Sequence, residues 1–108
     1  MQPHLVLKPL SETYGVTVGV TITPLPTIPG SAIRAKIQVE VNDIRARFDG
    51  TNSVTTGTGG GILLPVNTIA CPVHVIEGYD NLNRMRMRCQ GTTVSKINVV
   101  FEGEGQPS

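Results

Sequence analysis

Charged and aromatic residues are both scarce in this chain of 108 residues. Asp, Glu, Lys and Arg make up 16% of it, against about 25% in an average globular domain. The formal net charge is +1, and the aromatic residues are two Tyr and two Phe, with no Trp. So small a net charge provides no global field for nucleic acid, and so few aromatics provide few stacking platforms for its bases. The composition therefore argues against a nucleic-acid partner.

Long apolar runs and a dense set of cysteines are also missing. No run approaches the roughly 20 apolar residues of a membrane-spanning helix, and the first ten residues show no basic region followed by an apolar stretch. We therefore expect no membrane partner and no secretion signal. Cys71 and Cys89 are the two cysteines, and we expect both to be free thiols that pack as small apolar residues.

Residues that could form an active site or a metal site are few and scattered. His4 and His74 are the two histidines, and no serine lies in a nucleophile motif. Cys71 and His74 have a spacing seen in metal ligation, but on a strand they face opposite ways and no second pair completes the set. The glycine cluster at 57–61 lacks the Lys-Ser or Lys-Thr pair of a phosphate-binding loop. The sequence thus predicts no enzyme, no cofactor and no metal.

What the sequence does contain is alternation of apolar and polar residues, which places side chains on opposite faces of a strand. It recurs at 14–23, 32–41, 82–90 and 94–102. With shorter strands at 4–10, 44–48, 62–64 and 67–77, it predicts about eight strands and no helix. Short strands separated by turn signals are typical of an all-β, two-sheet antiparallel sandwich or jelly roll, with a small barrel as the alternative. We expect one such domain over 1–108, with a flexible tail at 103–108.

Proline and turn residues indicate how these strands are connected. The prolines within 24–30 cannot join a central ladder, so we expect a long connection there that crosses between the sheets. Asn42 and Asp43 tolerate positive φ, which a two-residue hairpin turn requires. That hairpin would place Ile37 opposite Phe48. Residues 49–61, rich in Gly, Thr and Asn, are expected to form a loop.

The most unusual feature is a row of three arginines, Arg84, Arg86 and Arg88. On a strand their side chains would project from one face about 7 Å apart, with Met85, Met87 and Cys89 on the other face. Their mutual repulsion requires acidic groups nearby. These could be Glu40 or Glu102 across the sheet, with Glu40 opposite Arg45 in the hairpin, or acids of another subunit, or an external anionic surface. The three arginines are therefore candidate partner-contact residues.

Tyr79 is a further candidate contact, because it stands beside Asp80 and Asn81. A glycan-binding sandwich needs an exposed aromatic or a carboxylate cluster at one end of its sheets. Tyr14 is the second tyrosine that could serve. These residues keep a glycan-binding module open as an alternative function.

The segment from Ile37 to Thr51, followed by 61–64, resembles small virion proteins of tailed bacteriophages. It shows an I-R-x-R-x-D-G-T step at 44–51, then a Thr-rich loop, a Gly and a short apolar strand, with a final strand near the carboxyl terminus. It departs from the pattern at 52–54, where Asn-Ser-Val replaces the usual Pro-Thr. The resemblance implies a short jelly-roll or sandwich subunit without catalytic residues, in which Asp49 and Gly50 form only a turn.

Proteins of this kind include capsid decoration or cement proteins, which clamp neighbouring capsid subunits, and minor tail components. The resemblance therefore implies a non-enzymatic structural protein of the virion, assembled in the host cytoplasm, that decorates the phage head. Its expected partners are the major capsid protein or another virion protein, and copies of itself in a dimer or trimer. A tail or fibre component is the alternative, together with the glycan-binding module.

Overall fold

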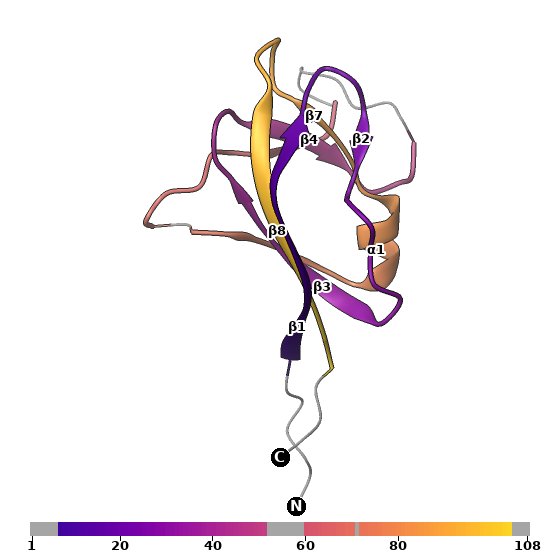
Figure 1. The fold of residues 1–108 in the computed structure, drawn as a ribbon. Coiled ribbons are helices and arrows are strands. Elements are labelled where there is room, and N and C mark those ends of the chain that lie inside the picture. The colour runs from indigo at the N-terminus through magenta and orange to yellow at the C-terminus, as the bar shows by residue number, and fades with distance from the viewer. Residues whose placement is uncertain (1–6, 52–59, 71, 105–108) are drawn as a thin grey trace, which may run out of the picture.

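The computed structural model describes residues 7–51, 60–70 and 72–104. These residues form two antiparallel sheets of four strands each and one short helix (Figure 1). The first sheet has the strand order β1-β8-β3-β6 and the second has the order β2-β7-β4-β5. The fold is therefore all-β and is the two-sheet antiparallel sandwich that the alternation predicts.

Strands that are consecutive in the chain often belong to different sheets. The first sheet contains β1 (Leu7–Val18), β3 (Ala32–Val39), β6 (His74–Glu77) and β8 (Ser95–Glu104). The second sheet contains β2 (Thr23–Pro24), β4 (Ile44–Arg47), β5 (Ile62–Leu64) and β7 (Arg86–Cys89). Helix α1 (Tyr79–Arg84) lies between β6 and β7 in the chain. In Figure 1 the long strands β1 and β8 run side by side down the centre, with α1 to one side.

The core lies between the two sheets and is built from the apolar positions of each alternating strand. The first sheet contributes fully buried side chains from β3 and β8: Ala35, Ile37, Val39, Ile97, Val99 and Phe101. The second contributes Ile44, Ala46, Met87 and Cys89, and Leu82 and Met85 are buried beside them. The predicted inward face of Met85, Met87 and Cys89 is thus confirmed. Cys89 is a buried free thiol, as expected, whereas Cys71 lies outside the described residues.

The hairpin predicted at Asn42 and Asp43 is wrong. β3 pairs with β6 and β8 in the first sheet, whereas β4 pairs with β5 and β7 in the second. Ile37 is therefore in register with Val99 and not with Phe48. Both turn residues keep negative φ, so the chain makes a corner from one sheet to the other and not a tight reversal.

Contacts from distant parts of the chain hold this corner. The Asn42 side-chain amide donates to the carbonyl of Val94 at 3.1 Å, and the backbone N–H of Val66 donates to Asp43 Oδ1 at 2.8 Å. The buried Ser95 hydroxyl accepts from the Asn42 N–H at 3.1 Å and donates to the Asn42 carbonyl at 2.5 Å. Because these groups satisfy the polar atoms of the bend, the corner needs no ladder between β3 and β4.

The expectation of no helix is also wrong. Residues Tyr79–Arg84 form α1, in which the N–H of Leu82 donates to the carbonyl of Gly78 at 3.1 Å. Leu82 and Met85, three residues apart, are both buried, as expected for one face of a helical turn. The strand predicted over 82–90 therefore begins only at Arg86.

In the first part of the chain, the strand boundaries of the structure differ from the predicted ones. The strands predicted over 4–10 and 14–23 are one strand, β1, with register shifts between Pro9 and Ser11 and between Thr13 and Val16. Residues 4–6 lie outside the described residues. The proline-rich connection does cross from the second sheet to the first, after Pro24 has paired at the edge in β2. In the predicted strand at 67–77, the described residues 67–70 and 72–77 form a strand only at β6.

The predicted flexible tail at 103–108 begins too early. Gly103 and Glu104 belong to β8, where Gly103 is buried against Leu10, and residues 105–108 lie outside the described residues. The predicted loop at 49–61 is described only at its ends, because 52–59 lie outside those residues as well. At its start Gly50 has φ 78° and Asp49 Oδ1 accepts from the Thr51 N–H at 3.1 Å, which confirms the expected turn.

Candidate binding surface

The two sheets differ in how their charges are balanced. The strands of the first sheet carry four basic and four acidic residues, which are Lys8, Arg34, Lys36 and Lys96, and Glu12, Glu77, Glu102 and Glu104. The strands of the second sheet carry four arginines and no acid. Positive charge is therefore concentrated in one sheet of a chain whose net charge is only +1.

The ladder between β4 and β7 places these four arginines next to one another. Arg45 is in register with Arg88, and Arg47 is in register with Arg86. The residues between them on each strand are buried, so the arginines project from the outer face of the second sheet. Opposite positions lie about 5 Å apart at Cβ and alternate positions on one strand about 7 Å apart. We call this array of Arg45, Arg47, Arg86 and Arg88 the arginine face.

Arg45 and Arg88, which lie opposite each other on the arginine face, both donate hydrogen bonds to neutral oxygens. Arg45 donates from Nε to Gln90 Oε1 at 2.8 Å and from Nη1 to the Gly61 carbonyl at 3.0 Å. Arg88 donates from Nε to the Cys89 carbonyl at 3.1 Å and from Nη2 to the Gly91 carbonyl at 3.2 Å. These bonds orient both guanidinium groups without neutralising their charge.

In the second opposed pair, Arg47 and Arg86, one arginine is ion-paired with a carboxylate. Arg86 donates from Nη1 to the carbonyls of Asn83 and Met85, both at 3.0 Å, whereas Arg47 forms an ion pair with Asp49. A hydrogen bond from the Thr51 backbone N–H, followed by those from Arg47 and the Thr51 hydroxyl, lowers the pKa of Asp49 to about 2. Asp49 is therefore ionised at neutral pH. Within the described ranges it is the one carboxylate paired with the four arginines.

Of the arginines singled out in the sequence, the structure places Arg86 and Arg88 on this face. Arg84 lies instead in the last turn of α1, where it is exposed. Arg45 and Arg47 were missed, because the expected hairpin placed Arg45 opposite Glu40. The signal that could have found them is their own alternation with the apolar residues of β4, which repeats the pattern of β7.

The acids expected to balance the row do not lie across from it. Glu102 is buried in the first sheet, where its carboxylate meets Arg34 Nε at 2.5 Å and Lys36 Nζ at 3.5 Å. Burial acts to raise the pKa of Glu102, but these two cations more than offset that effect and lower it. Glu40 lies at the corner after β3, in neither β4 nor β7.

Tyr79 lies apart from the arginine face. It is the first residue of α1 and is 41% exposed. The preceding residue, Gly78, donates its N–H to the carbonyl of Ile33 at 2.7 Å, which ties this end of the helix to the first sheet. Asn81, one of its two polar neighbours, donates its side-chain amide to the Glu77 carbonyl at 2.9 Å.

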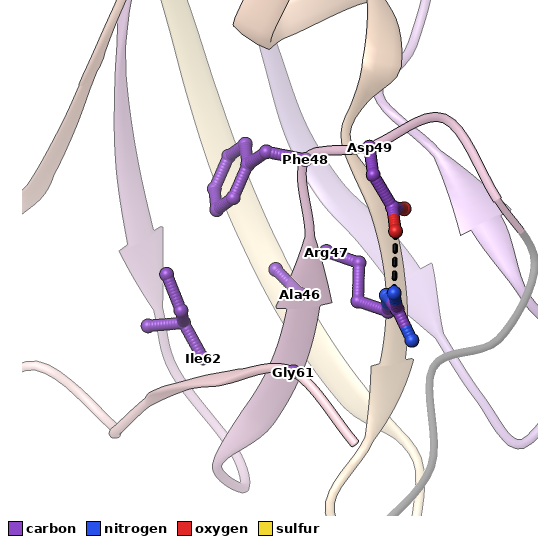
Figure 2. Close-up of a pocket in the computed structure, with 6 residues that line it drawn as sticks. All are labelled: Ala46, Arg47, Phe48, Asp49, Gly61 and Ile62. Atoms are coloured by element: carbon purple, nitrogen blue, oxygen red, sulfur yellow. Dashed lines mark hydrogen bonds and ion pairs between the residues drawn. The ribbon is translucent and has the colours of Figure 1, made fainter. Parts of the chain in front are cut away.

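A hollow of about 450 Å³ opens beside β4 and is lined by Ala46, Arg47, Phe48, Asp49, Gly61 and Ile62. Figure 2 shows Phe48 and Ile62 on one side of β4 and the Arg47–Asp49 pair on the other. All six lining residues belong to the described ranges 7–51 and 60–70. We assign no ligand to it.

The described residues contain neither a metal-binding cluster nor a membrane-spanning helix. Among the described residues, no three His, Cys, Asp or Glu side chains are grouped so that they could hold a metal ion. His74 lies on β6, as expected, with Nε2 2.9 Å from the Pro65 carbonyl. No helix within 7–51, 60–70 and 72–104 has the length and hydropathy needed to cross a membrane.

No protein-family model, curated protein or solved structure matches this chain. Its own residues, above all those of the arginine face, are therefore the guide to its function.

Proposed function

We infer that this chain is a non-enzymatic structural protein of a bacteriophage virion, and that it decorates the head by docking on the major capsid protein. The observation that supports the inference is the arginine face, on which, among the described residues, Arg47 is ion-paired and the other three arginines are not. The resemblance of residues 37–64 to small virion proteins supports the choice of a phage particle as the setting.

The arginine face has the properties of a contact surface. Like charges directly opposite each other on a ladder are destabilising, so an isolated domain gains nothing from this arrangement. The sequence has no acidic residue between Asp49 and Glu77, so the undescribed segment 52–59 brings no carboxylate to the face. A partner with acidic groups would relieve the repulsion on docking.

Co-sedimentation with empty heads tests this function. The protein is mixed with heads assembled from the major capsid protein encoded in the same genome, and heads already saturated with the unlabelled protein serve as the competition control. We expect saturable pelleting with the heads and a higher melting temperature of decorated heads, since a ligand that binds only the assembled state stabilises it. Protein that stays in the supernatant at all concentrations contradicts the proposal.

The same function predicts a dimer or trimer, because several linked arginine faces bind a repeating surface more tightly than one. Sedimentation equilibrium of the free protein measures this state. A monomer at the concentrations that saturate heads would remove this part of the proposal.

The alternative of a tail or fibre component, or of a glycan-binding module, depends on Tyr79 and the adjacent Asp80. The side chain of Asn81 is engaged with the Glu77 carbonyl, which leaves a smaller set of groups for a sugar. Binding on a glycan array that is lost in Tyr79→Ala would favour this alternative over head decoration.

A further inference from the structure

We propose that the arginine face binds an acidic β-strand of the partner protein, one in which Asp or Glu occupies alternate positions. This inference rests on the proposed function, because it identifies the surface and the chemistry by which the chain would dock. It differs from nucleic-acid binding, which the same positive charge would also permit.

The spacing of the four arginines matches that of an extended partner segment. Arg45 and Arg47 are two residues apart on β4, as are Arg86 and Arg88 on β7. Side chains two residues apart on a strand are separated by about 7 Å, and this holds for the partner as well as for this chain. Carboxylates at alternate positions of an extended segment therefore meet successive arginines without any change in register.

The four arginines are also held in place before a partner binds. An arginine has five N–H donors, and the hydrogen bonds described above use at most two nitrogens of each guanidinium. All four side chains are half-buried, so their stems are already packed before a partner arrives. A guanidinium fixed in this way loses less conformational entropy on binding, and its planar fork matches a carboxylate in two parallel hydrogen bonds.

Exposed apolar residues flank the arginine face on both sides. Leu63 is in register with Arg45 on the side of β5 and is 39% exposed, and the exposed Pro24 is in register with Arg86 on the side of β2. Arginine bordered by apolar groups is typical of protein interfaces. Single-stranded nucleic acid instead requires aromatic platforms, and both tyrosines lie elsewhere, Tyr14 on β1 and Tyr79 on α1.

The test uses fluorescence anisotropy with labelled synthetic peptides at low salt. One peptide has Glu at alternate positions between Thr residues, and its control has Gln in place of each Glu. A single-stranded oligo-dT and a DNA duplex of similar length complete the set. Three proteins are compared: the unchanged chain, Arg88→Glu and Lys8→Glu. Lys8→Glu is the matched control, because it makes the same change of charge on β1, in the sheet whose basic and acidic residues are equal in number.

We expect the Glu peptide to bind the unchanged chain and Lys8→Glu alike, and to bind Arg88→Glu at least about tenfold more weakly. Binding of the Glu peptide to the unchanged chain should also weaken steeply as the salt concentration rises. This measurement does not depend on whether a variant folds. Equal loss in Lys8→Glu, equal binding of the Gln peptide, or tighter binding of either DNA at the same salt would overturn the proposal.

The head-binding assay separates this inference from the proposed function. If no form of the protein pellets with heads, the proposed function fails. If Arg88→Glu pellets as well as the unchanged chain does, head decoration stands and the arginine face is not its contact surface.

Discussion

Arg45 and Arg88 lie directly opposite each other on β4 and β7, and in the described part of the chain both guanidinium groups donate to neutral oxygens. Arg45 is held by Gln90 and a backbone carbonyl, and Arg88 by two backbone carbonyls. The sheet thus maintains two adjacent positive charges that weaken its own pairing. Such a trade of stability for surface charge is expected at a binding surface.

Replacement of Arg88 by Glu should leave the domain about as stable as before. The change removes two hydrogen bonds to backbone carbonyls but puts an opposite charge beside Arg45. We expect the free energy of unfolding to change by less than about 1 kcal/mol. Urea unfolding followed by circular dichroism measures this, and a loss well beyond that value would show that Arg88 is needed for folding.

Ser95 should be essential for the corner between the sheets. Its buried hydroxyl bonds to both the N–H and the carbonyl of Asn42, so Ser95→Ala leaves these two groups without their partner. We expect the free energy of unfolding to fall by about 1–3 kcal/mol. Thr93→Ala, at an exposed position nearby, is the control and should change it little. Equal effects of the two substitutions would contradict the proposed role of Ser95.

Glu102 should make stability depend on pH in the acid range. Its pKa in the folded state lies below the ordinary value of 4.5, because Arg34 and Lys36 stabilise the buried carboxylate. The stability it contributes is therefore complete above about pH 4.5 and is lost as pH falls through the lower, folded-state pKa.

The test compares the unchanged chain with Glu102→Gln by urea unfolding between pH 7 and pH 3. The variant should be less stable by about 1–3 kcal/mol at neutral pH, and the difference should shrink below the ordinary pKa. Glu104→Gln, at the exposed end of β8, is the control. A difference that stays constant over the whole range would exclude the ion pairs as its cause.

Gly61 should resist substitution by alanine. Its φ is 138°, and a Cβ there would lie 2.8 Å from the carbonyl oxygen of Ala46 on the paired strand. We expect Gly61→Ala to cost about 1–3 kcal/mol of stability. Gly30 has no atom within 4 Å of a Cβ, so Gly30→Ala should be neutral or stabilising by up to about 1 kcal/mol. Thermal unfolding of both variants measures this difference in stability. Equal stability of the two variants would show that the β4–β5 ladder can shift to accommodate the Cβ.

The strands and their inward faces could be predicted because alternation is a local property. The positions of Ile97, Val99 and Phe101 follow from the two-residue period alone, and all three are fully buried. Strand pairing could not be predicted, because it depends on distant partners. Asn42 and Asp43 are compatible with a hairpin, and the corner forms instead because Val94, Ser95 and Val66 satisfy their polar groups.

Two of the four arginines of the arginine face could be predicted, because alternation along a single strand is a local property. Arg86 and Arg88 were found from their own strand, whereas Arg45 and Arg47 join them only through the β4–β7 ladder. Helix α1 was missed because its six residues bury a single side chain, Leu82, and the alternation of β7 runs on from its last turn without a break. A period of two over so short a stretch does not distinguish the two structures.

A cryo-electron-microscopy reconstruction of decorated heads tests the central claim most directly. The claim predicts that β4 and β7 face the head, with partner carboxylates within hydrogen-bonding distance of Arg45 and Arg88. A reconstruction in which the sheet β1-β8-β3-β6 faces the head, with the four arginines exposed to solvent, would contradict it.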